Sequence, residues 1–239
     1  MKESFQHDGI RFDLYRKASD RCGMTLYILL PRGLGEETEK WCEEVAGDHG
    51  TCRSGACTSI VLVRGMDWNN DLTPWPAEGV FKKAKPFEGR AQAFLRALSG
   101  ELVPWFEKEA GLEGCRRTLA GISLSGLFAL WAAHSCDTFD CIATISGSFW
   151  YDSMAEWVET HELNPSVKRI FIALGDREKR SKDPRMARVE ECTQRIVERL
   201  GKQTEVKYVL EENITHFSPI VPRLERLFLY LQMQRDLQE

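Results

Sequence analysis

The stretch Arg117–Gly126, which reads RTLAGISLSG, decides the fold of this chain. Arg117–Ala120 has the composition of a short strand, and Ser125–His134 has that of a helix. Between them, GISLSG matches the nucleophile elbow G-x-S-x-G except at its last position, where Ser125 stands. An elbow needs small residues on both sides of its serine because strand and helix approach closely there. We therefore interpret Ser123 as a catalytic nucleophile; the alternative is a helix-capping serine in a glycine-rich turn.

Strands and helices alternate on both sides of this turn. This pattern, with strands nearly continuous in Val, Ile and Leu, predicts an α/β fold whose mostly parallel central sheet carries helices on both faces. We see no linker and no large lid domain, so we expect one domain over residues 1–239. Ile10–Tyr15 alternates and is expected at an antiparallel edge. The other expected strands are Met24–Leu30, Ser59–Val63, Arg117–Ala120, Cys141–Ser146, Arg169–Leu174 and Glu205–Leu210; the expected helices are Gln92–Ala110, Ser125–His134, Met186–Leu200 and Pro222–Met233.

Composition excludes several classes of protein. The 239 residues hold 32 Lys and Arg against 36 Asp and Glu, a net charge of −4, which does not favour nucleic acid as a partner. No apolar run reaches the roughly 18 residues of a membrane span, and the first residues lack the apolar stretch of a signal peptide, so we expect a cytoplasmic protein. The eight cysteines form no C-x-x-C pair and are interpreted as free thiols, with no metal site: Cys22, Cys42, Cys52, Cys57, Cys115, Cys136, Cys141 and Cys192.

A serine nucleophile requires a base, and one histidine stands in a suitable place. His216 follows the last expected strand and precedes the last expected helix, which is the position and chain order of the base in this kind of fold. A structural loop histidine is the alternative. The remaining histidines are interpreted as solvated or as a helix cap: His7, His49, His134 and His161.

The acid that orients the base should follow the strand Arg169–Leu174. Asp176 and Glu178 both stand there, and Asp183 is better explained as the cap of a helix starting near Pro184. For the oxyanion hole we expect the backbone amide of Leu124 and one from the loop after Ser59–Val63, for which we choose Met66.

Six stretches in chain order resemble a known family. They are Asp71–Pro74 (DLTP), Phe94-Leu95 with Glu101–Trp105, Ala120–Leu127 (AGISLSGL), Ser146–Tyr151 (SGSFWY), Gly175 with Glu178, and Thr215–Ser218 (THFS). The chain resembles the "Putative esterase" family of α/β-hydrolases, which includes trilactone siderophore esterases, S-formylglutathione hydrolase and the antigen 85 mycolyltransferases. The resemblance implies an α/β-hydrolase fold, and it favours Glu178 over Asp176 as the acid. Ser125 and Thr215 depart from the family's glycine and asparagine, and Asn69-Asn70 replace an arginine of the trilactone esterases.

These residues predict a serine esterase that acts on a small-molecule ester through an acyl-enzyme, without metal or cofactor. An acyltransferase on the same scaffold and a non-catalytic binding module are the alternatives, and the oligomeric state is left open. Two groups bear on the substrate. One is a set of aromatic residues that either line a pocket or belong to the core: Trp68, Trp75, Phe149, Trp150 and Tyr151. The other is a basic run that is either solvated or contacts an anionic substrate: Arg177, Lys179, Arg180 and Lys182.

Overall fold

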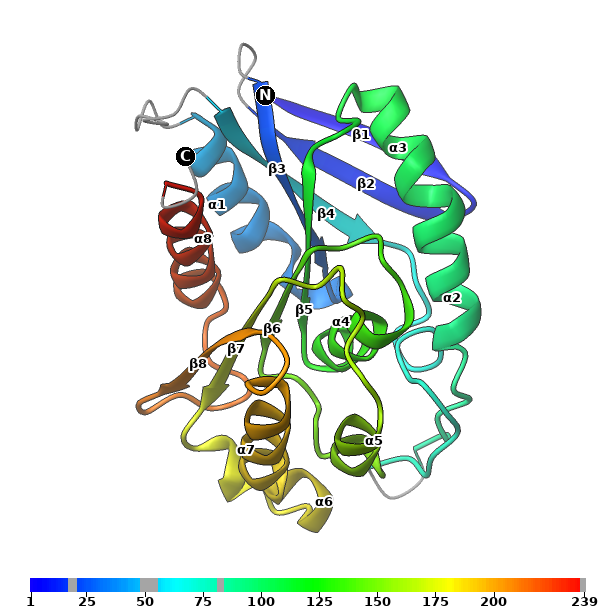
Figure 1. The fold of residues 1–239 in the computed structure, drawn as a ribbon, viewed down its shortest axis with the longest axis vertical. Helices are drawn as coiled ribbons and strands as arrows, with labels where there is room; N and C mark the ends of the chain where they lie inside the picture. Colours follow the sequence, from blue (N-terminus) through cyan, green and yellow to red (C-terminus); the bar gives the residue numbers. More distant parts are fainter. Residues whose placement is uncertain (17–20, 48–55, 81–83, 237–239) are drawn as a thin grey trace.

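The computed structural model describes residues 1–16, 21–47, 56–80 and 84–236, and within them the strands form one eight-stranded sheet (Figure 1). Its order is β1-β2-β4-β3-β5-β6-β7-β8. All pairs from β4 to β8 are parallel, whereas β1 and β2 pair antiparallel with each other and β2 with β4. The strands are β1 Lys2–His7, β2 Ile10–Tyr15, β3 Arg21–Leu29, β4 Ala56–Arg64, β5 Arg116–Ile122, β6 Cys141–Ile145, β7 Arg169–Gly175 and β8 Glu205–Glu211.

Helices cover both faces of the sheet, as Figure 1 shows. Helices α1 and α8 pack on one face, where Trp41 and Leu227 belong to the same buried cluster. The other face carries α2, α3, α4, α5 and α7, and its cluster includes Phe106, Leu127 and Ile196. The helices are α1 Gly35–Gly47, α2 Ala91–Ala97, α3 Val103–Ala110, α4 Leu124–Ser135, α5 Met154–Thr160, α6 Pro184–Ala187, α7 Val189–Leu200 and α8 Val221–Asp236. None of the helices in the described residues is long and apolar enough to cross a membrane.

The predicted α/β-hydrolase fold is confirmed, with some differences in its elements. The expected helix Gln92–Ala110 consists of α2 and α3 joined by a π-helical turn, Leu98–Leu102. The strand expected to end at Ala120 runs to Ile122, because Gly121 and Ile122 still pair with β6. No connection in the described residues forms a large lid.

Helices α1 and α5 and strand β1 were not predicted from the sequence. Strand β1 pairs with β2 through the turn Asp8-Gly9, where both residues have positive φ values of 47° and 77°, as a two-residue hairpin turn requires. Its last residue, His7, was expected to be solvated, but its ring stacks on that of Trp105 with centroids 4.6 Å apart. Helix α1 was missed because charged residues fill most of its surface, and only a narrow stripe, including Trp41, is buried.

The cysteines whose side chains the structure describes are free thiols, as expected: Cys42, Cys115, Cys136, Cys141 and Cys192. Burial raises the pKa of Cys141 to about 12, so this thiol is neutral. Cys52 and His49 lie outside the described residues, and so do the side chains of Cys22 and Cys57.

Candidate active site

The turn between β5 and α4 holds Ser123 in a strained conformation. Its backbone φ is +60° and its ψ is −121°. Residues other than glycine rarely adopt this combination, which is typical of a nucleophile elbow. A Cβ atom on Gly121 would lie 2.0 Å from the carbonyl oxygen of Ser125, so only glycine fits there. The close approach of β5 and α4 therefore presents Ser123 at the carboxyl edge of the sheet.

Ser125, which replaces the second glycine of the pattern, is fully buried and hydrogen-bonded. Its hydroxyl accepts from the amide of Ile122 at 2.7 Å and lies 2.8 Å from the carbonyl oxygen of Leu29, to which it donates. The departure from glycine thus ties the elbow to the end of β3.

We expect Ser125→Ala to lower the free energy of unfolding by about 1–3 kcal/mol, because it leaves a buried amide and a buried carbonyl without their partner. Urea unfolding measures this change. Ser135→Ala, at the exposed end of the same helix, is the matched control and should change stability much less. Equal stabilities of the two variants would show that the Ser125 hydroxyl does not stabilise the elbow.

Three predicted side chains meet at this edge of the sheet. His216 Nε2 lies 3.1 Å from Ser123 Oγ, and His216 Nδ1 lies 2.9 Å from Glu178 Oε2. The side chain of Glu178 is 4% exposed and that of His216 is 24% exposed. A hydroxyl, an imidazole and a buried carboxylate therefore form one hydrogen-bonded chain that opens toward solvent at the imidazole.

The carboxylate of Glu178 is surrounded by donors. Its Oε1 accepts from the Ser146 hydroxyl and, at 2.9 Å, from the Gly175 amide, and it lies 3.9 Å from Arg223 Nη2. Burial alone would raise the pKa of Glu178, but the hydrogen bonds from His216, Ser146 and Gly175 outweigh burial and hold this pKa below its ordinary value. Glu178 is therefore ionised at neutral pH and accepts the hydrogen on Nδ1 of His216.

The other two candidate acids lie elsewhere. Asp176 donates its amide to the Glu211 carbonyl, and its Oδ1 is buried without a hydrogen-bond partner in the described residues. Asp183 caps α6, as predicted, and accepts from the amides of Arg185 and Met186 at 2.9 and 3.1 Å.

The loop that carries His216 is held against the end of β7. A Cβ atom on Gly175 would lie 2.4 Å from the Ile214 carbonyl oxygen, and the amide of Arg177 donates to this same oxygen at 3.0 Å. This contact requires glycine at position 175. It holds the loop with Glu178 next to the loop with His216.

The two residues predicted for the oxyanion hole follow different strands of the sheet. Leu124 is the first residue of α4, so its amide belongs to the free amino end of that helix. Met66 follows β4 and, with Leu30 and Trp68, lines a cavity of about 440 Å³. Strand β3 separates β4 from β5, so the loop after β3 is also adjacent to the elbow. The use of Met66 stays a prediction.

The predicted aromatic residues divide between two roles. Trp150 lines a cavity of about 370 Å³ beside His216, and Trp68 lines the cavity next to Met66. Phe149 is buried in the core. The hydroxyl of Tyr151 donates to the Trp75 carbonyl at 2.5 Å, which ties the loop after β4 to the segment after β6.

The remaining described histidines lie apart from this chain of hydrogen bonds. His134, at the end of α4, has Nδ1 3.0 Å from the Glu162 carbonyl, and burial lowers the pKa of His134 to about 4. The ring of His161 stacks on Trp157. His7, the last residue of β1, has Nε2 3.1 Å from Oε1 of Glu101.

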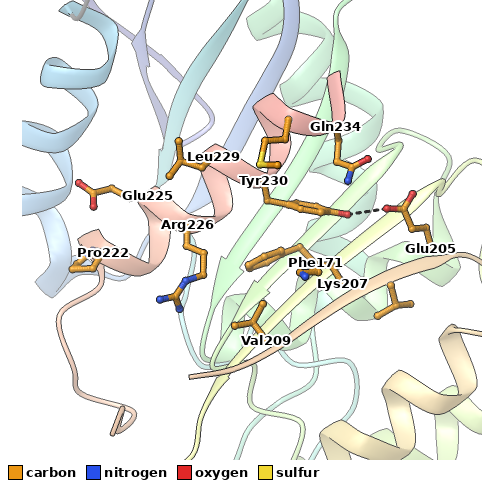
Figure 2. A pocket seen from close by; sticks show the side chains of 12 residues that line it. Phe171, Glu205, Lys207, Val209, Pro222, Glu225, Arg226, Leu229, Tyr230 and Gln234 are labelled. Carbon is orange, nitrogen blue, oxygen red and sulfur yellow. Dashed lines mark hydrogen bonds between the residues drawn. The ribbon is translucent and has the colours of Figure 1, made fainter. Parts of the chain in front are cut away.

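A larger groove of about 690 Å³ lies between β8 and α8 (Figure 2). Its lining includes Phe171 and Tyr230, whose rings are 5.3 Å apart, and the Tyr230 hydroxyl donates to Glu205 at 3.3 Å. The residues that line it include no serine, cysteine or histidine. The hydrogen-bonded side chains of Ser123, His216 and Glu178 lie at the carboxyl edge of the sheet and not in this groove.

Three residues near the site were not assigned a role from the sequence. Ser146 donates to Glu178, and the Ser148 hydroxyl lies 3.3 Å from Ser123 Oγ. Arg223 is 3% exposed and lies between the two buried carboxylates Glu178 and Glu211. The position of Ser146 and Ser148 directly after β6 was the available signal, whereas nothing local distinguishes Arg223 within its helix.

The strand order, the strained serine between β5 and α4, and the later loops with Glu178 and His216 together define an α/β-hydrolase fold. Residues 27–217 match the family described as "Putative esterase". The chain belongs to this family.

One curated protein is similar in sequence over part of the chain. "Uncharacterized protein YbbA" of Bacillus subtilis (strain 168) is 32% identical over 129 residues, which are 52% of this chain and 51% of that protein. The match thus spans about half the length of this curated relative.

Two solved structures share the fold at lower identity. The siderophore hydrolase EstA of Aspergillus nidulans has a TM-score of 0.72 at 19% identity and covers 98% of this chain and 93% of its own. The IroE-like serine hydrolase of Shewanella oneidensis has a TM-score of 0.71 at 16% identity and covers 92% of this chain and 76% of its own.

Proposed function

We propose that this protein is a serine esterase that hydrolyses small-molecule carboxylic esters through an acyl-enzyme. The observation that carries this proposal is the hydrogen-bonded chain from Ser123 through His216 to Glu178. Membership in the "Putative esterase" family supports the same reaction class.

In this mechanism His216 Nε2 accepts the hydroxyl proton as Ser123 Oγ forms a bond to the ester carbonyl carbon. Glu178 stays ionised and stabilises the imidazolium through Nδ1. The carbonyl oxygen becomes an oxyanion, which the Leu124 amide and the proposed amide of Met66 stabilise. When the tetrahedral intermediate collapses, the bond to the alcohol oxygen breaks and His216 donates its proton to that oxygen.

Water completes the cycle. His216 accepts a proton from a water molecule while the water oxygen attacks the acyl carbon, and the bond from this carbon to Ser123 Oγ then breaks. His216 returns this proton to Ser123 Oγ, which restores the hydroxyl, and the carboxylic acid leaves. Every step uses residues of this chain, and none requires a cofactor.

A fluorophosphonate probe tests the proposal, because it reacts with an activated serine and not with an ordinary hydroxyl. We expect one covalent adduct per chain, located on Ser123 by mass spectrometry. Heat-denatured protein and Ser123→Ala are the controls and should stay unlabelled. If the folded protein is not labelled, Ser123 is not an activated nucleophile and the binding-module alternative is favoured.

Turnover of an ester panel then identifies the reaction. The panel runs from short-acyl nitrophenyl esters to aromatic esters and trilactones; trilactones belong in it because relatives of this fold are named siderophore hydrolases. Added alcohol separates hydrolysis from acyl transfer, since an acyltransferase forms the new ester in preference to the free acid.

A further inference from the structure

The cavity beside His216 has one apolar side and one cationic side. Trp150, Met186, Val189 and Phe217 supply the apolar surface. Phe217 is 90% exposed, which is unusual for a phenylalanine, and binding of an apolar group would remove part of its ring from water. The cationic side belongs to the loop that also carries Glu178.

The reaction chemistry determines which half of an ester this cavity can receive. His216 must deliver a proton to the leaving oxygen, so the alcohol portion of the substrate lies on the imidazole side of Ser123. Glu178 and His216 themselves line this cavity. If the proposed function holds, the cavity is therefore the site for the alcohol portion. Its volume of about 370 Å³ is at the small end of ligand pockets and suits one ring with a substituent.

The charges of the cavity do not cancel. Glu178 is its acidic residue, and this carboxylate is occupied by hydrogen bonds from His216, Ser146 and Gly175. Arg177 donates to the neutral side-chain amide of Asn213. Arg180 is exposed and has no side-chain hydrogen bond or ion pair with any of the described residues.

The neighbouring cations of the same loop region are already paired or lie outside the cavity. Lys179 forms an ion pair with Glu190 at 3.0 Å. Arg185 lies over the Trp150 ring but is paired with Asp152 at 2.9 Å. This contrast singles out Arg180, with Arg177 next to it, as the positive charge that a ligand in the cavity would meet.

We propose that this cavity binds an ester whose alcohol portion carries an anionic group, with Arg180 as the principal contact of that group and Arg177 as a second one. The planar guanidinium of arginine suits a carboxylate, to which it donates two parallel hydrogen bonds. The apolar part of the alcohol packs on Trp150, Met186 and Phe217. Arg180 is thus a specificity-determining residue of the site.

A matched pair of esters tests this subsite. 3-Acetoxybenzoate and its methyl ester share the acyl group and the ring and differ in one negative charge; rates without protein are subtracted. We expect kcat/KM of the wild type to be about tenfold higher for the anionic ester, mainly through a lower KM, and to lose this preference as salt is raised. In Arg180→Gln the ratio of the two kcat/KM values should fall close to one. Arg177→Gln should lower it less.

Lys182→Gln is the matched control, because Lys182 belongs to the same basic run, is exposed and does not line the cavity. It removes the same charge and should leave the ratio at the wild-type value. A wild type without preference, or an Arg180→Gln variant with the wild-type ratio, would overturn the subsite while hydrolysis of both esters still supports the proposed function.

A binding measurement does not depend on turnover. 3-Hydroxybenzoate, the alcohol product, is titrated by NMR into wild type, Arg180→Gln and Lys182→Gln. We expect Kd to rise about tenfold in Arg180→Gln alone. Should neither ester be hydrolysed, the fluorophosphonate probe and the wider ester panel decide the proposed function, and this titration decides the subsite: equal Kd values in the three proteins, or no binding to the wild type, would overturn it.

Discussion

Replacing Ser123 with alanine is expected to lower kcat for the best ester of the panel by about 10⁴-fold or more. The expectation rests on the position of the hydroxyl, 3.1 Å from Nε2 of His216, where the imidazole can accept its proton. The neighbouring Ser148 hydroxyl lies 3.3 Å from Ser123 Oγ and does not occupy the strained elbow. Steady-state kinetics of the purified variant measure the loss.

The variant must be folded for this result to be informative. Circular dichroism and urea unfolding should give values close to those of the wild type, because the removed hydroxyl takes part in chemistry and little in packing. Ser135→Ala serves as the control for a serine-to-alanine change near the same helix. A folded Ser123→Ala protein with nearly full activity would show that another residue is the nucleophile.

The second large effect concerns the acid. Glu178→Gln is expected to lower kcat by about 10²- to 10⁴-fold, whereas Asp176→Asn should have a much smaller effect. Glutamine cannot stabilise the imidazolium, and its amide group also favours the wrong tautomer of His216. Asp176 does not share these contacts: its amide donates to the Glu211 carbonyl, and its carboxylate Oδ1 has no hydrogen-bond partner in the described residues.

The two variants form a matched pair, because each replaces a carboxylate by its amide within one loop. Measuring kcat for both under the same conditions separates their roles, and fluorophosphonate labelling rates provide a second readout of the nucleophile's activation. A strongly impaired Asp176→Asn protein beside an active Glu178→Gln protein would assign the acid to Asp176.

The strained elbow at Ser123 could be predicted from the sequence because its requirements are local. A tight strand-to-helix turn needs small residues within two positions of the serine, and Gly121 leaves no room for a Cβ atom. The parallel strands were equally visible, since burial on both faces produces continuous apolar runs. Weak local signals explain what was missed: α1 buries a narrow stripe, and β1 alternates between exposed and half-buried residues.

The sequence by itself determined the class of fold, the elbow with Ser123, and the position of His216 after the last strand. The tertiary structure decided which carboxylate meets this histidine, that Ser146 and Arg223 surround that carboxylate, and that Arg180 lines a cavity next to His216. His216 lies 93 residues from Ser123 and 38 from Glu178 along the chain. Contacts at such separations depend on how parallel strands bring their following loops to one edge of the sheet, and no local pattern of residues encodes that arrangement.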